Sequence, residues 1–242
     1  MNLTKKTTSL LCMAALGISP LFLMGQQNLP EVNTTDNQGR KHGEWIKTDR
    51  RGDTVYRGRF EHGKPVDTFR YFYPEGKLKA TIFYTPDQSI TYATLFFQNG
   101  NKKAEGKYID KKRDSIWNFY RKEGKLVSKK PFKHGETDGL AKFFYFSGAL
   151  LKETHYEQGT KSGKEVIYYK NNNKKKVQHF SRGKLDGPFT LFYEDGDTMR
   201  TGRYKMDLRT GEWRDYTDKG ELERVRSYRN GDLIEDKKLE TD

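Results

Sequence analysis

Aromatic residues recur every 24 positions along most of the chain. The series is Phe60, Tyr84, Tyr108, Phe132, Tyr156, Phe180, Tyr204 and Tyr228. In most copies a turn-forming residue follows three positions later, as Gly63 and Gly135 do. A second series of turn residues runs from Gly52 to Gly220 at the same spacing, with one slip that the next copy compensates. A fixed period of this length indicates an array of small units that bury their apolar faces by stacking on one another.

Each unit has the pattern of a β-hairpin. In residues 67–90, two segments rich in aromatic and branched side chains flank Pro74–Gly76. Within the first segment, Phe69 and Tyr71 project from one face of a strand and Phe72 from the other. No unit contains a glycine-free stretch in which apolar residues recur at the spacing of a helix. The sequence therefore predicts an all-β fold: an elongated, twisted antiparallel sheet of about eight serial hairpin repeats.

Two features interrupt the regular pattern. The position of Phe69 carries a large aromatic in some units but Ala93, Ala141 or Glu165 in others. Pro131 falls inside a predicted strand, where it cannot donate a hydrogen bond to the neighbouring strand. We expect a bulge or a local break of the sheet at this proline.

The two ends of the chain differ from the array. Residues 1–25 resemble a secretory signal peptide, with a basic start, an apolar run and a cleavage position before Gln26. A membrane anchor is the competing interpretation, although the run is short and Pro20 interrupts it. We assign residues 26–42 to an N-terminal segment with a partial capping repeat, 43–234 to the array and 235–242 to a charged tail that discourages association at the sheet edge.

The chain is strongly basic. It has 46 Lys and Arg against 33 Asp and Glu, a net charge of +13. Loss of Lys5 and Lys6 with the signal peptide leaves 44 − 33 = +11. Such a charge favours anionic partners, although it also keeps an exposed sheet soluble. The only cysteine, Cys12, lies in the signal peptide, so the exported chain would have neither a disulfide nor a cysteine nucleophile.

The motifs that could carry catalysis are better explained by the repeat. Residues 58–64 have the glycine and lysine spacing of a phosphate-binding loop, but Pro65 follows where such a loop needs Ser or Thr. His42, His62 and His134 precede turn glycines and lack the local spacing of metal ligands. We therefore predict a protein that is not an enzyme and that has no catalytic residues, metal or cofactor.

The recurring text Gly-x-Trp, followed by paired aromatics and Gly-x-Leu, resembles the MORN repeat in its bacterial variant. Clear copies begin at Gly43, Gly187 and Gly211, and the resemblance covers residues 36–234. It implies a sheet of serial antiparallel hairpins with a role in binding or scaffolding. The chain departs from the motif where Asp67, Thr91 and Ser115 replace its first glycine.

Two sets of residues are candidates for binding. Large aromatics dominate interface energetics, so we predict as anchors for a protein partner Trp45, Trp117, Trp213, Phe69 and Phe189. Basic clusters are candidates for an anionic surface, and we expect repetition to align them along one edge of the sheet. They are Lys102, Lys103, Lys111, Lys112, Arg113, Lys129, Lys130, Lys174, Lys175 and Lys176.

The sequence thus favours an exported, non-enzymatic scaffold that binds another protein of the cell envelope. The alternative is attachment to an anionic membrane or glycan surface, and a minor one is an antitoxin-like protein that neutralises a toxin. The export signal places the protein in the periplasm, on the outer-membrane surface or outside the cell. Nucleic acid is not an expected partner, and the oligomeric state stays open.

Overall fold

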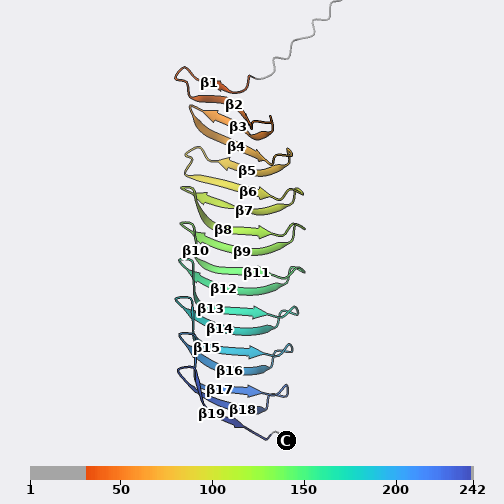
Figure 1. The fold of residues 1–242 in the computed structure, drawn as a ribbon, viewed down its shortest axis with the longest axis vertical. Helices are drawn as coiled ribbons and strands as arrows, with labels where there is room; N and C mark the ends of the chain where they lie inside the picture. Colours follow the sequence, from red (N-terminus) through yellow and green to blue (C-terminus); the bar gives the residue numbers. More distant parts are fainter. Residues whose placement is uncertain (1–30, 241–242) are drawn as a thin grey trace, which may run out of the picture. The chain divides into compact units, whose positions relative to one another are not determined.

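The computed structural model describes residues 31–240, so the predicted signal peptide, Cys12 and residues 26–30 lie outside the described part. Its 19 strands form a single open antiparallel sheet (Figure 1). The strands are β1 (Thr34–Thr35), β2 (Lys41–Thr48), β3 (Thr54–Glu61), β4 (Lys64–Phe72), β5 (Leu78–Tyr84), β6 (Ile90–Phe96), β7 (Lys102–Ile109), β8 (Lys112–Tyr120), β9 (Leu126–Lys133), β10 (Glu136–Thr137), β11 (Gly139–Phe144), β12 (Leu150–Glu157), β13 (Thr160–Tyr168), β14 (Lys174–Ser181), β15 (Lys184–Phe192), β16 (Thr198–Lys205), β17 (Leu208–Tyr216), β18 (Leu222–Arg229) and β19 (Asp232–Lys238).

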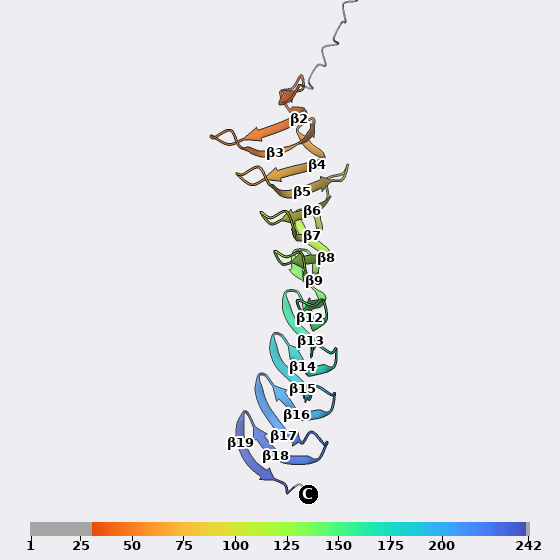
Figure 2. The same cartoon turned by 90° about the vertical axis from the view of Figure 1, so that its right-hand side faces the viewer.

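Strands follow one another in the sheet in the order of the sequence, which confirms the predicted serial hairpins. For example, Trp45 of β2 is registered with Gly58 of β3, and Gly211 of β17 with Tyr228 of β18. Loops within a unit lie at one side of the sheet, on the right in Figure 1, and we call this side the hairpin edge. Loops between units lie at the other side, the connection edge. Figure 2 shows the strand direction turning gradually along the sheet, as the preferred strand twist requires.

The first glycine of the motif forms a bulge where one unit meets the next. Arg57 is registered with Arg70 and Arg59 with Val66, so β4 carries two extra residues opposite Gly58. The residue that turns the strand there has a positive φ: 58° at Asp67. The same position has a positive φ at Gly43, Ser115, Gly139, Gly163, Gly187 and Gly211. Asp and Ser therefore replace glycine with some strain but keep the bulge.

Thr91 replaces the same glycine for a different reason. Its strand β6 pairs with β5 without a register break, from Ala80 opposite Leu95 to Tyr84 opposite Thr91. A regular strand pair needs no residue with positive φ, so a β-branched threonine fits there. The motif glycine is replaced at this unit because no bulge forms there. The hairpin itself is retained.

The largest buried side chains lie on one face of the sheet, which we call the aromatic face. Phe69, Trp117 and Trp213 are at most 2% exposed. Each of them lies over a glycine of the preceding strand, and Trp117 lies over Gly106. Ala93 takes the same position opposite Ile82, so a small residue there is matched by a larger partner. The weak copy of the motif at Ala93 is thereby explained by complementary volumes.

Pro131 marks a break in the sheet, as predicted. The strand opposite β9 is interrupted between β10 and β11, and both pieces pair with β9. The backbone N–H of Asp138, at the interruption, donates to the carbonyl of Pro131 at 3.0 Å. The proline carbonyl is therefore satisfied although its nitrogen has no proton to donate.

The two ends of the sheet are finished differently. At β2, Trp45 Nε1 donates to the Thr34 carbonyl at 2.9 Å, and Asn33 Oδ1 accepts from the Ile46 N–H at 2.8 Å. At the other end β19 is exposed along its whole length. The predicted tail 235–242 needs correction, because its residues up to Lys238 belong to this strand and pair with β18.

Candidate binding surfaces

The aromatic residues predicted as protein anchors are mostly part of the interior. Trp117 is 0% exposed and both Trp213 and Phe69 are 2% exposed, while Trp45 and Phe189 are half-buried. The interpretation of the three buried residues as exposed anchors is therefore wrong. Sequence reasoning could not separate the two roles, because a wide aromatic over a glycine looks the same in the sequence whether it is covered or exposed.

Trp117 shows how a single sheet covers a large ring. Tyr108 packs edge-on at 4.9 Å between ring centroids, and the Arg113 guanidinium lies 4.8 Å above the ring. The indole Nε1 donates to the Lys107 carbonyl at 2.9 Å. Long side chains from the connection edge thus form part of the cover, and Arg113 from a predicted basic cluster serves this structural role.

The basic clusters do not align along one edge, so that prediction is wrong. Lys102 and Lys103 begin β7 and Lys174–Lys176 begin β14, both at the hairpin edge. Lys111, Lys112 and Arg113 lie at the opposite, connection edge where β8 begins. Lys129 and Lys130 stand in the middle of β9 and point to opposite faces. A strand of eight or nine residues separates the two edges, so clusters that are close in the sequence lie at opposite edges of the sheet.

The central part of the hairpin edge nevertheless carries an excess of cations, and we call this part the basic edge. Its exposed members are Lys102, Lys103, Arg121, Lys122, Lys125, Lys170, Lys174 and Lys175. Glu123 is the one acidic residue in the four hairpin loops at 97–101, 121–125, 145–149 and 169–173, whereas the loops on either side of these four carry Glu75, Glu194, Asp195 and Asp197. Lys102 is also held by Glu105 at 2.8 Å. Phe146, 57% exposed, stands in the loop between β11 and β12, flanked on both sides by the basic loops.

The face opposite the aromatic face carries an exposed apolar stripe. Tyr92, Ile116 and Leu140 occupy the same position in three consecutive units and are 51%, 52% and 44% exposed. Phe83, 43% exposed, is registered with Tyr92, and their ring centroids are 6.5 Å apart. Pro131 is registered with Ile116. We define the apolar stripe as these five residues, which come from β5, β6, β8, β9 and β11.

A shallow hollow of about 530 Å³ opens within the apolar stripe. Tyr92 and Ile116 form part of its wall, and Gly106 is among its lining residues. Lys107 and Glu105 line it as well. The hollow therefore offers room for an apolar side chain, with charged groups beside it.

The apolar stripe is absent from the sequence predictions. A signal for it exists, since Tyr92, Ile116 and Leu140 stand one period apart at positions that alternate with the buried residues Ala93, Trp117 and Ala141. Thr68 and Lys164 hold the same position in the adjacent units. A search for apolar residues on the face away from the core would have found the three.

Glu165 lies at the centre of a polar network on the aromatic face, where it is 2% exposed. Thr154 Oγ1 donates to it at 2.7 Å, Gln178 Nε2 at 2.7 Å and Lys161 Nζ at 2.9 Å. Burial raises the pKa of this carboxyl, but these hydrogen bonds outweigh the effect and hold the pKa below its usual value. Glu165 is therefore ionised at neutral pH and joins three strands.

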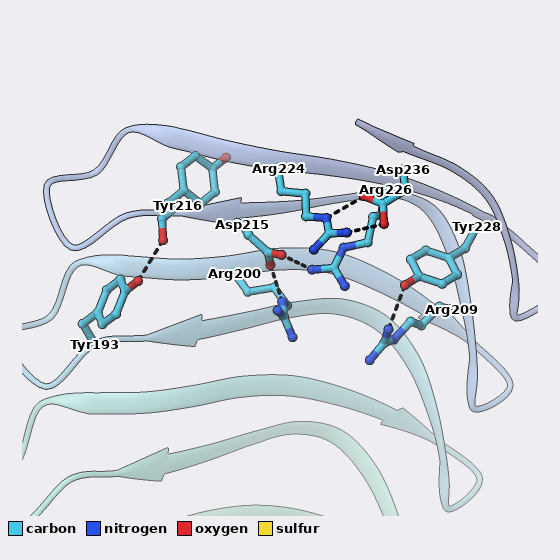
Figure 3. Close-up of polar contacts among 9 residues, drawn as sticks. All are labelled: Tyr193, Arg200, Arg209, Asp215, Tyr216, Arg224, Arg226, Tyr228 and Asp236. Atoms are coloured by element: carbon cyan, nitrogen blue, oxygen red, sulfur yellow. Dashed lines mark hydrogen bonds and ion pairs between the residues drawn. The ribbon is translucent and has the colours of Figure 1, made fainter. Parts of the chain in front are cut away.

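A second network occupies the aromatic face at the C-terminal end (Figure 3). Asp215 accepts from Arg200 and Arg226, and Asp236 accepts from Arg224 at 2.5 Å. Burial raises the pKa of Asp215, and its two arginine partners lower it further than burial raises it. Asp215 thus links β16, β17 and β18, and Asp236 links β18 and β19. The pKa of both carboxyls is lowered, so both are ionised at neutral pH.

Arg209 completes this region beside the ring of Trp213. Its guanidinium lies 4.9 Å from the ring centroid and donates to the Tyr228 hydroxyl at 2.9 Å. Tyr193 donates to the Tyr216 carbonyl at 2.9 Å in the same region (Figure 3). The Arg209 bond joins the neighbouring strands β17 and β18, whereas the Tyr193 bond joins the end of β15 to the end of β17.

Within residues 31–240, no group of three histidine, cysteine or carboxylate side chains is arranged to hold a metal ion. The same residues contain no helix of the length and apolar character needed to span a bilayer. The hollows on the sheet are open, and the one at the C-terminal end, about 500 Å³, is lined by Thr201, Arg203 and neighbouring residues.

Comparison with known proteins gives one family. The family model of the MORN repeat variant matches residues 68–85 and 137–158. No match was found among curated proteins.

Several solved structures match parts of the chain at low identity and low TM-score. The crystal structure of TarM is 17% identical with a TM-score of 0.23, over 51% of this chain and 20% of that one. The crystal structure of TcdB2-TccC3-TEV is 12% identical with a TM-score of 0.23, over 79% of this chain and 12% of that one. The structure of the Photorhabdus luminescens Tc holotoxin pore is 11% identical with a TM-score of 0.20, over 75% and 12%. The chain spans at most 20% of the length of these three proteins.

Proposed function

We propose, from the premise that this chain carries MORN repeat variants, that it is an exported, non-enzymatic scaffold that binds another protein of the cell envelope. The observation that supports this function is the apolar stripe. Three successive units present Tyr92, Ile116 and Leu140 to solvent at equivalent positions. Scattered exposed apolar residues are common on soluble proteins, whereas a row of them on one face of a sheet is typical of an interaction site.

The sheet geometry suits this role. Each unit contributes two strands, so the stripe is an extended contact surface and the binding energy is spread over several units. The networks around Glu165 and Asp215 stabilise the opposite face and leave the stripe face free of their contacts. A rigid sheet that presents apolar side chains on one face binds a partner with little loss of conformational entropy.

Export is the other part of the proposal, and it is supported by the predicted signal peptide. Mass spectrometry of the mature protein tests it, with an expected N-terminus at Gln26. An intact Met1 on protein recovered from the cytoplasm would contradict it.

A pull-down from envelope extract tests the binding function. The mature protein serves as bait beside the double variant Ile116→Thr, Leu140→Thr, which removes apolar area from the stripe while retaining β-branched residues. The control is Leu208→Thr, Leu233→Thr, whose residues are 47% and 52% exposed on β17 and β19, away from the stripe. We expect a partner that the bait and the control retain and the stripe variant loses. Equal retention by all three baits would refute the role of the stripe.

The basic edge supports a second candidate function, attachment to an anionic membrane or glycan surface. Its eight exposed cations accompany one acidic residue, and Phe146 stands among them. Such attachment weakens steeply with salt, because exposed charges are screened over about 8 Å at physiological ionic strength.

Vesicle sedimentation at low and moderate salt tests this candidate. Neutralising the basic edge with Lys122→Gln, Lys174→Gln, Lys175→Gln should abolish binding to vesicles with anionic lipid. The matched control is Lys111→Gln, Lys112→Gln, Lys133→Gln, which removes as many charges from the connection edge. If both triple variants lose binding equally, net charge alone explains it and the basic edge is not a site.

A further inference from the structure

We infer that the apolar stripe receives an amphipathic α-helix with acidic residues along its flanks. This inference rests on the proposed function, since it names the kind of segment that a protein partner would place there. It follows from the spacing of the stripe, from the hollow within it and from the charges beside it.

The spacing of the stripe matches a helix. Tyr92 on β6, Ile116 on β8 and Leu140 on β11 are each separated by two strand positions, about 9.6 Å at the usual strand spacing. Residues seven apart on a helix lie on one face and are about 10.5 Å apart along its axis. A β-strand repeats on one face at about 6.8 Å and falls out of phase with the stripe. A helix lying across the strands therefore meets all three side chains.

The hollow provides the place where such a helix is anchored. Tyr92 and Ile116 stand on either side of it, and Gly106 lines it between their strands. An added Cβ at Gly106 would collide with Trp117 on the other side of the sheet, so the core itself requires a glycine here. A leucine or phenylalanine of the helix fits above this glycine, in the manner of helix-in-groove recognition.

Lysines beside the stripe determine the charge of the partner. Lys129 of β9 is registered directly with Lys142 of β11, an arrangement of like charges that destabilises a strand pair. Glu153 holds Lys142 at 3.1 Å, whereas Lys129 is exposed and forms no ion pair with another described residue. Carboxylates on a bound helix would relieve this repulsion.

Lys107 extends the cationic flank to the hollow. It is registered with Tyr92 on one side and with Asp114 on the other, and no ion pair joins Lys107 to Asp114 within residues 31–240. Glu105, the other acid at the hollow, is already held by Lys102 at 2.8 Å and by the Tyr120 hydroxyl. A partner at the hollow therefore meets the cation of Lys107 with the carboxylate of Asp114 on the next strand, while Lys129 adds a second cation further along the stripe.

Three synthetic peptides of about 21 residues, or three heptads, serve as probes. The first has leucine at two positions of each heptad and glutamate along the flanks. The second replaces every glutamate by lysine. The third keeps the composition of the first but carries central prolines that prevent a helix. Binding to the mature protein is measured by fluorescence anisotropy at physiological salt.

We expect the acidic helical peptide to bind at least ten times more tightly than the other two. Ile116→Thr with Leu140→Thr should weaken this binding at least tenfold, while the control Leu208→Thr, Leu233→Thr leaves it unchanged. Lys107→Glu with Lys129→Glu should reverse the preference in favour of the lysine peptide. Far-UV circular dichroism and the melting temperature verify that each variant is folded.

Each other result overturns the inference. Equal binding of the proline peptide means that the stripe takes an extended segment, and equal binding of the lysine peptide means that charge does not select the partner. Binding that survives the stripe variant places the helix elsewhere. If none of the peptides binds, the inference fails, whereas the proposed scaffold function is decided separately by the pull-down.

Discussion

Gly58, Gly106 and Gly202 leave room for an aromatic side chain of the next unit. A Cβ at these glycines would lie 2.5 Å from Phe69, 2.4 Å from Trp117 and 2.2 Å from Trp213. No side chain fits at these distances. Where the second residue of the pair is small, as Ala93 is, the first becomes Ile82. In these pairs a small residue on one strand thus accompanies a larger residue on the next strand.

Replacing the pair Gly106 and Trp117 by isoleucine and alanine, as in the pair Ile82 and Ala93, tests this rule. Gly106→Ile alone should destabilise the fold by about 3 kcal/mol, because the side chain has no space under Trp117. Trp117→Ala alone should cost about 4 kcal/mol through the cavity it leaves. The double variant reproduces the Ile82 and Ala93 pair, so it should be more stable than the sum of the two single variants by about 1–3 kcal/mol. Urea denaturation of the four proteins measures this coupling.

Additive losses in that cycle would show that the volumes are not coupled. The pair Gly148→Ile with Trp117→Ala is a control for additivity, because nothing lies within 4 Å of a Cβ at Gly148 in its hairpin loop. Its members are in different units, so their effects on the free energy of unfolding should simply add.

Adjacent hairpins are joined by tyrosine hydroxyls as well as by strand pairing. Tyr73 donates to the Phe96 carbonyl at 2.8 Å, Tyr145 to the Tyr168 carbonyl at 2.7 Å and Tyr169 to the Phe192 carbonyl at 2.8 Å. The tyrosine position recurs every 24 residues, and Phe97 and Arg121 occupy it in the two units between Tyr73 and Tyr145. Each bond joins the end of the first strand of one hairpin to the end of the first strand of the following hairpin.

Removal of one hydroxyl should weaken the junction between two hairpins. We expect Tyr145→Phe to lower the free energy of unfolding by about 1 kcal/mol, since one hydrogen bond to a backbone carbonyl is lost. Thermal denaturation followed by circular dichroism detects this change. Tyr92→Phe, at an exposed residue of the stripe, is the comparison and should change stability by less than about 0.5 kcal/mol. Equal effects would mean that the Tyr145 hydroxyl contributes nothing.

The Glu165 network makes one junction sensitive to pH. Its folded-state pKa lies below the usual value of 4.5, so the charged carboxyl stabilises the fold above that value and the contribution is lost as the pH falls through the folded pKa. Glu165→Gln should therefore cost about 1–3 kcal/mol at pH 7, and the difference from the unmodified protein should shrink below pH 4.

Urea denaturation between pH 3 and pH 7 measures that difference. Glu123→Gln in an exposed hairpin loop is the matched control and should stay within about 0.5 kcal/mol of the unmodified protein at every pH. A constant gap between Glu165→Gln and the unmodified protein over this range would show that ionisation of Glu165 does not contribute.

At the scale of the whole sheet, each hairpin contacts only its neighbours, so stability varies along it. Ala93, Ala104 and Trp117 form the apolar cluster, packed against Ile82, Leu95, Tyr108, Phe119 and Phe132 on β5 to β9. The same face carries Arg200, Asp215, Arg224 and Arg226 near the C-terminal end. Charged cross-links pay desolvation costs that an apolar cluster avoids, so the β5–β9 region should be the most stable.

Amide hydrogen exchange should reveal this gradient. We expect the slowest exchange in β6 to β9 and faster exchange in β17 to β19, because opening of a terminal hairpin breaks contacts on one side only. Trp117→Ala should accelerate exchange in β6 to β9 and leave β17 to β19 nearly unchanged. A single exchange rate for all protected amides, before and after the substitution, would indicate one cooperative unit and contradict the gradient.

The sequence by itself determined the serial hairpins, their approximate number, the break at Pro131 and the resemblance to the repeat whose family model matches two segments of the chain. These follow from local chemistry, because glycines set the turns and alternating aromatics set the strands. The departures at Ala93 and Glu165 looked like weak copies of the motif, since each residue was compared with a consensus and not with its partner on the neighbouring strand.

Only the tertiary structure decided which aromatics are covered and which surfaces are free. Trp117 and Ile116 are adjacent in sequence and similar in hydrophobicity, yet one is 0% and the other 52% exposed. Likewise, Lys103 and Lys112 belong to clusters close in sequence but stand at opposite edges of the sheet. The physical reason is that burial and edge position depend on pairing across strands, on the hand of each bulge and on long side chains folded over the core, all of which join residues distant along the chain.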